Sequence, residues 1–187
     1  MRILSVVGNR SELVASTPVS LALRERGAEE IVVETGESLD DLRERLALPP
    51  PAYRLEAGTG TDGEETGRLL TAIETLLLAE RPDAVLVFGD TNTTLAAALA
   101  AGKLLVPVAH VRAGLRSFDR SLPEELNRVL VDRLADLLFC PTEAAVENLA
   151  AEGITDGVHL VGDVMDEAAG AHAAARTADL LIYDESR

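Results

Sequence analysis

Short runs of aliphatic and β-branched residues recur along the chain and predict the strands of a buried sheet. They lie at residues 2–8, 30–35, 84–90, 106–111, 136–141 and 157–163. Within each run the apolar residues are continuous rather than alternating with polar ones, which is typical of strands covered on both faces. We therefore expect a parallel sheet.

Helix-length segments rich in Ala, Leu, Glu and Arg separate these runs. The clearest are residues 64–82, 93–105 and 124–138. In the first of them, Leu69, Ile73 and Leu77 recur at a spacing of four, so one helix face is expected in the core. Strands that alternate with helices predict an α/β fold, a three-layer α/β/α Rossmann-like sheet with right-handed crossovers.

Two segments depart from this alternation. Residues 46–67 contain three prolines and four glycines, and we expect a long functional loop or flap there. Residues 169–187 read as an Ala-rich helix followed by a short apolar run. The chain therefore ends where a second domain would begin, and we expect residues 1–187 to form one Rossmann-like domain.

Charge narrows the range of partners. The 187 residues include 17 Lys and Arg against 32 Asp and Glu, a formal net charge of -15. Such a chain repels phosphate backbones and anionic lipids, so neither nucleic acid nor membrane is an expected partner. With no bilayer-length apolar run and no leader-like N-terminus, we expect a soluble cytoplasmic protein. The single Cys140 suits a buried strand position rather than a reactive one.

Candidate chemistry lies in the loops after the strands, where ligands of open parallel sheets bind. The GNRSE loop holds Gly8, which frees the backbone, and Arg10, which is either placed to reach an anionic group or an ordinary surface residue. The GDTNTT loop holds Asp90, Thr91 and Thr94. Asp90 or Thr91 either caps the next helix or faces a ligand.

The segment HVRAGLRSFDRSLPEELNR, residues 110–128, is the most site-like part of the chain. Its candidate residues are His110, Arg112, Arg116, Glu124, Glu125, Asn127 and Arg128. Pro123 and the two carboxylates after it also suit the start of a helix without any catalysis. Arginines and carboxylates in one cleft nevertheless offer both phosphate pairing and proton transfer, which favours a functional site.

Other site types are disfavoured by the sequence. It contains no GxGxxG fingerprint after the first strand, no GxxxxGK[ST] phosphate loop and no GxSxG nucleophile elbow. His110, His159 and His172 lack metal-ligand spacing, and His159 is expected to pack in or at the edge of the sheet. We expect neither a metal nor a cofactor.

An ordered set of motifs runs along most of the chain: GNR, ETGRLL, RPDAVLVFGDTNTTLAAALAA, PVAHVRAGLRSFDRSLPEELNR, LFCPTEAAVENL and GVHLVGDVM. This set resembles the N-terminal half of non-hydrolysing UDP-N-acetylglucosamine 2-epimerases. The resemblance implies a GT-B architecture, in which two Rossmann-like halves enclose the active site. It also implies that the C-terminal, UDP-binding half is absent from this chain.

The resemblance further implies a reaction and its residues. UDP-GlcNAc and UDP-ManNAc are interconverted in that family by elimination and re-addition of UDP. Carried over by motif, Arg10, Asp90 and Glu124 fall on catalytic positions. Substrate binding is assigned to Thr94, His110, Arg112, Arg116, Glu125, Asn127 and Arg128. The implied partner is a UDP-sugar, and the cleft is completed by a separate C-terminal half or by a homodimer.

Several positions depart from the family pattern. The family reads HVEAGLR where this chain has Arg112, and it carries a lysine where this chain has Ala15. Ser38 replaces a histidine, Asp62 stands in a loop that carries a histidine, and Asp166 replaces a tyrosine. These departures leave two alternatives to an enzyme half: a catalytically impaired pseudoenzyme that binds sugar nucleotides, and an interaction module.

Overall fold

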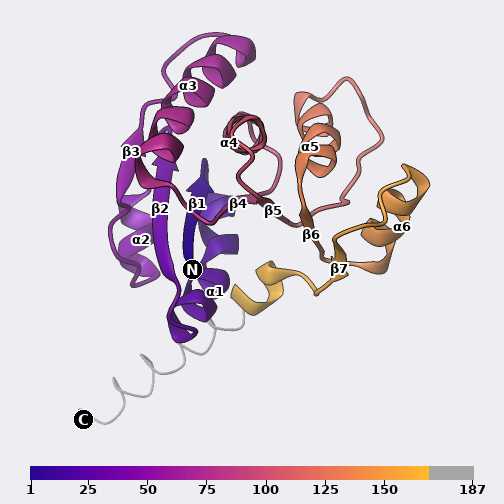
Figure 1. The fold of residues 1–187 in the computed structure, drawn as a ribbon, viewed down its shortest axis with the longest axis horizontal. Coiled ribbons are helices and arrows are strands. Elements are labelled where there is room, and N and C mark those ends of the chain that lie inside the picture. Colours follow the sequence, from indigo (N-terminus) through magenta and orange to yellow (C-terminus); the bar gives the residue numbers. More distant parts are fainter. Residues whose placement is uncertain (169–187) are drawn as a thin grey trace, which may run out of the picture.

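The computed structural model describes residues 1–168, which form a seven-stranded parallel sheet with the strand order β3-β2-β1-β4-β5-β6-β7 (Figure 1). The strands are β1 (Arg2–Val7), β2 (Glu29–Thr35), β3 (Tyr53–Leu55), β4 (Ala84–Phe88), β5 (Val108–Val111), β6 (Leu137–Cys140) and β7 (Val158–Leu160). All six predicted strands are present, and the parallel Rossmann-like sheet is confirmed.

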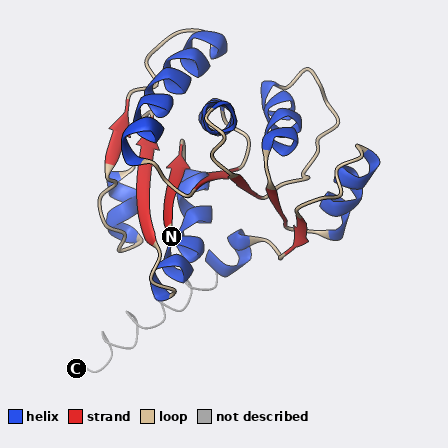
Figure 2. Ribbon diagram, in the orientation of Figure 1, coloured by secondary structure: helices blue, strands red, loops and turns tan. Residues whose placement is uncertain are grey.

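Helices cover both faces of the sheet, so the predicted three layers are present (Figure 2). The helices are α1 (Arg10–Glu25), α2 (Asp40–Arg45), α3 (Asp62–Glu80), α4 (Asn92–Lys103), α5 (Pro123–Leu134) and α6 (Glu143–Ala151). On one face α3, α4 and α5 pack on the sheet, and on the other α1 and α2 do. None of the helices within residues 1–168 is long and apolar enough to cross a bilayer.

The predicted inner face of α3 lies in the larger core. Leu69, Ile73 and Leu77 are buried there against strand residues such as Leu4 and Val33. Next to it, α4 contributes a set of alanines that are fully buried. Their small side chains let α4 lie close to the sheet and to its neighbouring helices, so the layer is tightly packed.

The expectation of one long loop at residues 46–67 is wrong in part. Residues Tyr53–Leu55 form β3, which pairs with the end of β2. Helix α3 then begins at Asp62, because Thr61 and Glu64 form a capping box: the Thr61 amide donates to Glu64 Oε2 at 2.8 Å. A strand of three residues carries too little periodicity to be read from the sequence.

Three smaller expectations concern the last two strands and the C-terminal segment. Cys140 is fully buried, and burial raises the pKa of its thiol to about 11, in agreement with a structural role. His159 lies on the edge strand β7, exposed, with its ring 5.8 Å from that of Phe139. The Ala-rich segment expected at residues 169–187 lies outside the described residues.

Candidate functional site

The polar loops after β1, β4 and β5 meet at one edge of the sheet. These three strands are neighbours, and all run parallel. Their carboxyl ends therefore lie side by side, and the loops after them bring the GNR, GDT and HVRAGLR segments together (Figure 1).

The turn after β1 is closed by its own side chains. Asn9 caps α1 by accepting from the amide of Glu12 at 2.8 Å, and the Gly8 amide donates to Glu12 Oε2 at 2.6 Å. A β-carbon at Gly8 would stand 2.6 Å from Thr93 Oγ1, so a larger residue does not fit. The glycine is thus required by the close approach of the GNR loop to α4.

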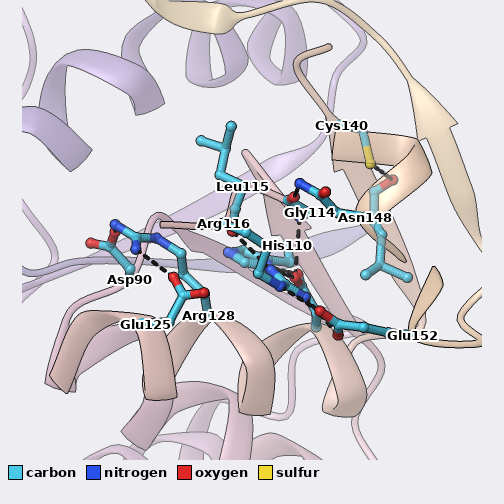
Figure 3. Close-up of polar contacts among 12 residues, drawn as sticks. Asp90, His110, Gly114, Leu115, Arg116, Glu125, Arg128, Cys140, Asn148 and Glu152 are labelled. Carbon is cyan, nitrogen blue, oxygen red and sulfur yellow. Dashed lines mark hydrogen bonds and ion pairs between the residues drawn. The ribbon is translucent and has the colours of Figure 1, made fainter. Parts of the chain in front are cut away.

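Arg128 links two carboxylates in the centre of the site. It forms an ion pair with Asp90, and its Nη1 donates to Glu125 Oε2 at 3.0 Å (Figure 3). Asn127, also on α5, donates to the backbone oxygen of Asp90 at 2.9 Å. The loop after β4 is therefore tied to α5 at both its backbone and its side chain.

Glu125 anchors the loop that precedes α5. Its carboxylate accepts from the backbone amides of Ser117 at 2.9 Å and Phe118 at 3.0 Å. Burial alone would raise the pKa of Glu125, but the hydrogen bonds from Ser117, Arg128 and Phe118 outweigh it and lower that pKa to about 2. Glu125 is therefore a fixed anion and holds the loop in place.

Behind this layer, His110 and Arg116 belong to a buried charged network centred on Asp132. Asp132 Oδ1 lies 2.7 Å from His110 Nδ1, and Oδ2 accepts from Arg116 Nη1 at 2.7 Å. Burial opposes ionisation of Asp132, yet its bonds to His110 and Arg116 lower its pKa. Glu152 pairs with Arg116 through both carboxylate oxygens (Figure 3).

The neighbours of His110 hold its ring at both nitrogens. Its Nε2 lies 2.8 Å from the backbone oxygen of Gly89, and its Nδ1 faces the Asp132 carboxylate. Both ring nitrogens are thus engaged, so the orientation of the His110 ring is fixed. His110 is 1% exposed and the Arg116 side chain is fully buried, so both lie beneath the site and hold its loops.

Glu12 is a site residue that the sequence did not reveal. It is 4% exposed, and burial raises its pKa to about 7, although the bond from Gly8 works in the opposite direction. Its Oε1 lies 3.1 Å from Thr94 Oγ1, and Thr94 donates to the backbone oxygen of Phe88 at 2.7 Å. The Thr94 hydroxyl thus has two acceptors within hydrogen-bond distance, Glu12 Oε1 and the backbone oxygen of Phe88. The only sequence signal was its place in the first turn of α1.

Two cavities open at this edge of the sheet. The smaller, which we call the inner pocket, has a volume of about 60 Å³ and lies among Glu12, Ala15, Asp90, Arg112 and Arg128. The larger, which we call the outer hollow, has a volume of about 360 Å³. The outer hollow is lined by Gly8, Asn9, Asp62, Glu65, Asp90, Thr91, Asn92, Thr93, Pro123, Glu124 and Asn127.

The remaining predicted residues differ in how they meet these cavities. Glu124 is exposed and borders the outer hollow together with Asp90. Arg10 is exposed outside both and pairs with Asp41 at 3.1 Å. Thr94 is 1% exposed and lies within α4, whose N-cap is Thr91. Asp90 and Glu124 are thus together, Arg10 is near the rim of the site, and Thr94 is beneath it.

Within residues 1–168 no group of three or more His, Cys, Asp or Glu side chains is arranged to hold a metal ion. The side chains that line the two cavities include carboxylates and guanidinium groups, which lie beside the N-termini of α1 and α4.

The chain matches the protein-family model described as UDP-N-acetylglucosamine 2-epimerase over residues 21–184. A UDP-N-acetylglucosamine 2-epimerase homolog of Methanococcus maripaludis is 49% identical over 88% of this chain. The UDP-2,3-diacetamido-2,3-dideoxy-D-glucuronate 2-epimerase of Pseudomonas aeruginosa is 47% identical over 90% of it.

Solved structures agree with these matches. The UDP-GlcNAc 2-epimerase of Methanocaldococcus jannaschii aligns with a TM-score of 0.87 at 46% identity over 90% of this chain. The same enzyme in complex with UDP-GlcNAc and UDP aligns with a TM-score of 0.84 over 87% of it. The matches cover 47% of the Methanococcus homolog, 50% of the Pseudomonas enzyme and 47% of the solved chain, so this chain spans about half the length of these relatives.

Proposed function

This chain belongs to the UDP-N-acetylglucosamine 2-epimerase family, and on that premise we propose that it interconverts UDP-GlcNAc and UDP-ManNAc once a second domain completes its cleft. The observation that carries the proposal is the outer hollow, where Asp90 and Glu124 face one space beside the N-terminus of α4. At about 360 Å³ the hollow falls within the ordinary size range of small-molecule sites.

The proposed reaction needs two carboxylates. One accepts the proton from C2 of the sugar while the C1–O bond to UDP breaks, which leaves an unsaturated sugar. Return of a proton to the opposite face of C2 and re-addition of UDP to C1 give the epimer. We assign these proton transfers to Asp90 and Glu124, since Arg128 and Asn127 hold Asp90 in a fixed place.

Stabilisation of the departing UDP requires a cation near the hollow. We assign this role to Arg10, whose guanidinium is half-exposed and bound to Asp41, itself exposed. An exposed ion pair of this kind contributes little, about 0 to 1 kcal/mol, so a diphosphate can displace Asp41 at small cost.

The buried residues are assigned a supporting role. His110 and Arg116 hold the loops after β4 and β5, while Glu125, Asn127 and Arg128 position Asp90. Together with Thr94, which supports Glu12, they hold the outer residues in place. A separate C-terminal half, or a second copy of this chain, supplies the other wall of the cleft.

The test is binding and turnover of UDP-GlcNAc. We expect the chain to bind UDP-GlcNAc in calorimetric titration, and to form UDP-ManNAc, followed by proton NMR, when mixed with the C-terminal half of the Methanocaldococcus jannaschii enzyme. Asp90→Asn keeps the size of the side chain and removes the base, so turnover should fall at least about 100-fold. The proposal would be rejected if UDP-GlcNAc were neither bound nor turned over, both by the chain alone and by the chain mixed with the C-terminal half.

One observation favours the second candidate, a sugar-nucleotide-binding pseudoenzyme. Arg112 occupies the place where the motif HVEAGLR of the family carries a carboxylate. If that carboxylate is indispensable, UDP-GlcNAc binds and no UDP-ManNAc forms under any arrangement. Arg112→Glu in the same mixture distinguishes the two candidates, because it raises turnover only if Arg112 is the defect.

A further inference from the structure

Arg112 reaches into the inner pocket from an unusual backbone conformation. It stands directly after β5 with φ at 67°, a region that residues with a side chain rarely adopt. Its amide donates to the backbone oxygen of Phe139 at 3.0 Å, which fixes the turn. Arg112 thereby lines the same pocket as Ala15 and Glu12.

The Nε of Arg112 is buried beside a carboxylate but makes no hydrogen bond within residues 1–168. Asp163 Oδ1 is an ion-pair partner at 3.3 Å from that Nε. By contrast, Arg116 and Arg128 each donate to carboxylates. A buried donor that makes no hydrogen bond is unfavourable, so an incoming oxyanion that accepts from Arg112 would be favoured.

The other walls of the inner pocket do not oppose an anion. The Glu12 side chain is uncharged below about pH 7, because burial raises its pKa to about 7. Asp90 is neutralised by Arg128. Ala15 is small, and the pocket volume of about 60 Å³ is several times the ~15 Å³ that one water probe needs, which suits a single oxyanion group.

The position of the charge is informative as well. Where the motifs of the family place a lysine on the first helix and a carboxylate after HV, this chain has Ala15 and Arg112, and both line the inner pocket. Of these two positions, the one at the end of β5 carries a cation in this chain and the one on α1 does not, while Arg128 also lines the pocket. This arrangement explains both departures with one physical cause.

We propose that Arg112 is the anion-binding residue of the inner pocket and receives an oxyanion of the substrate, either a phosphate oxygen of the nucleotide or a carboxylate carried by the sugar. The inference rests on the proposed function in taking a sugar nucleotide as the ligand. On this inference Arg112 determines which substrate binds, rather than being a substitution that impairs catalysis.

The test observes Arg112 directly. In the 15N-labelled chain, the Nε–H resonance of Arg112, assigned with Arg112→Lys, is followed while pyrophosphate or glucuronate is added at constant ionic strength. A saturable shift with pyrophosphate identifies phosphate as the ligand group, and a shift with glucuronate identifies the carboxylate. No saturable shift with either anion overturns the proposal.

Variants separate the site from general electrostatics. Arg112→Ala should weaken binding of the active anion about tenfold, the effect of losing about 1.4 kcal/mol, and adding Ala15→Lys to it should restore most of that loss. Arg26→Ala removes the same charge at the far end of α1 and should change the affinity little. Equal loss in Arg112→Ala and Arg26→Ala contradicts a specific site.

The outcome is separable from that of the proposed function. If the chain turns over UDP-GlcNAc and Arg112→Ala binds both anions normally, this inference alone fails. If pyrophosphate shifts Arg112 while UDP-GlcNAc is neither bound nor turned over, the epimerase proposal alone fails.

Discussion

At the scale of single residues, Glu12 gives stability an unusual dependence on pH. Its pKa in the folded protein is about 7, raised from 4.5. The neutral Glu12 side chain therefore contributes fully to the free energy of unfolding below about pH 4.5, and this contribution is lost as pH rises through about 7. Across that window the loss is about 3 kcal/mol.

We expect Glu12→Gln to remove this loss, because an uncharged amide of the same size can keep the contacts with Gly8 and Thr94 without burying a charge. Urea unfolding at pH 5, 6.5 and 8 should show the variant gaining stability relative to the wild type as pH rises. A difference that stays constant over this range would show that Glu12 is ionised in the fold. Glu125→Gln is the matched control: its carboxylate has a lowered pKa, so its contribution is present above about pH 4.5 and lost below it.

Asp132 supports the site from below, and its removal tests that role. Asp132→Asn takes one negative charge from between His110 and Arg116, both buried. Breaking a buried ion pair on one side costs about 3 to 5 kcal/mol, so the melting temperature should fall sharply. Asp119→Asn, in an exposed turn, should have little effect. An Asp132→Asn variant as stable as the wild type would contradict the network.

The sequence predicted which residues gather at this edge of the sheet but not how deep each one lies. His110 and Arg116 occur in the same dense polar segment as Glu124, yet they are buried and Glu124 is exposed. Their depth depends on Asp132 and Glu152, which lie on α5 and beside α6, far along the chain. Such tertiary pairing leaves no local pattern to read.

At the scale of elements, the strands and long helices were predictable because each carries a recognisable apolar pattern, a continuous run in the strands and a stripe along one face in the helices. The three residues of β3 do not, and the start of α3 was missed because its signal is the capping pair Thr61 and Glu64 rather than an apolar stripe. The alternation of strands and helices was then sufficient to predict that the strands run parallel.

The contact between the GNR loop and α4 can be tested with a single methyl group. Gly8→Ala would place a β-carbon 2.6 Å from Thr93 Oγ1 and 2.7 Å from Thr93 Cβ, so loop and helix must separate. We expect a loss of about 1 to 3 kcal/mol in unfolding free energy and weaker ligand binding. Gly63→Ala, in the first turn of α3 with open space around it, should be neutral or stabilising by up to about 1 kcal/mol. Equal effects of the two substitutions would contradict the close approach.

At the scale of the whole molecule, one apolar surface stands out. Leu126 and Leu130 of α5, with Leu122 before them, recur at a spacing of four and are 49%, 39% and 41% exposed, and Phe118 nearby is 75% exposed. Contiguous exposed apolar surface tends to be covered by a partner, so we expect this stripe to be a contact surface, and a second copy of the chain is the partner that can be tested directly.

Self-association should therefore depend on this stripe. Sedimentation velocity over a range of concentrations is expected to show dimers of the wild-type chain, and Leu126→Glu should shift them to monomers because a carboxylate would be buried unpaired at the contact. Leu78→Glu changes a leucine on α3 that is more exposed than Leu126, and it should leave the dimers intact. Loss of dimers in both variants would point to charge repulsion, which the net charge of -15 already supplies, and a monomer at all concentrations would leave a different protein as the partner of α5.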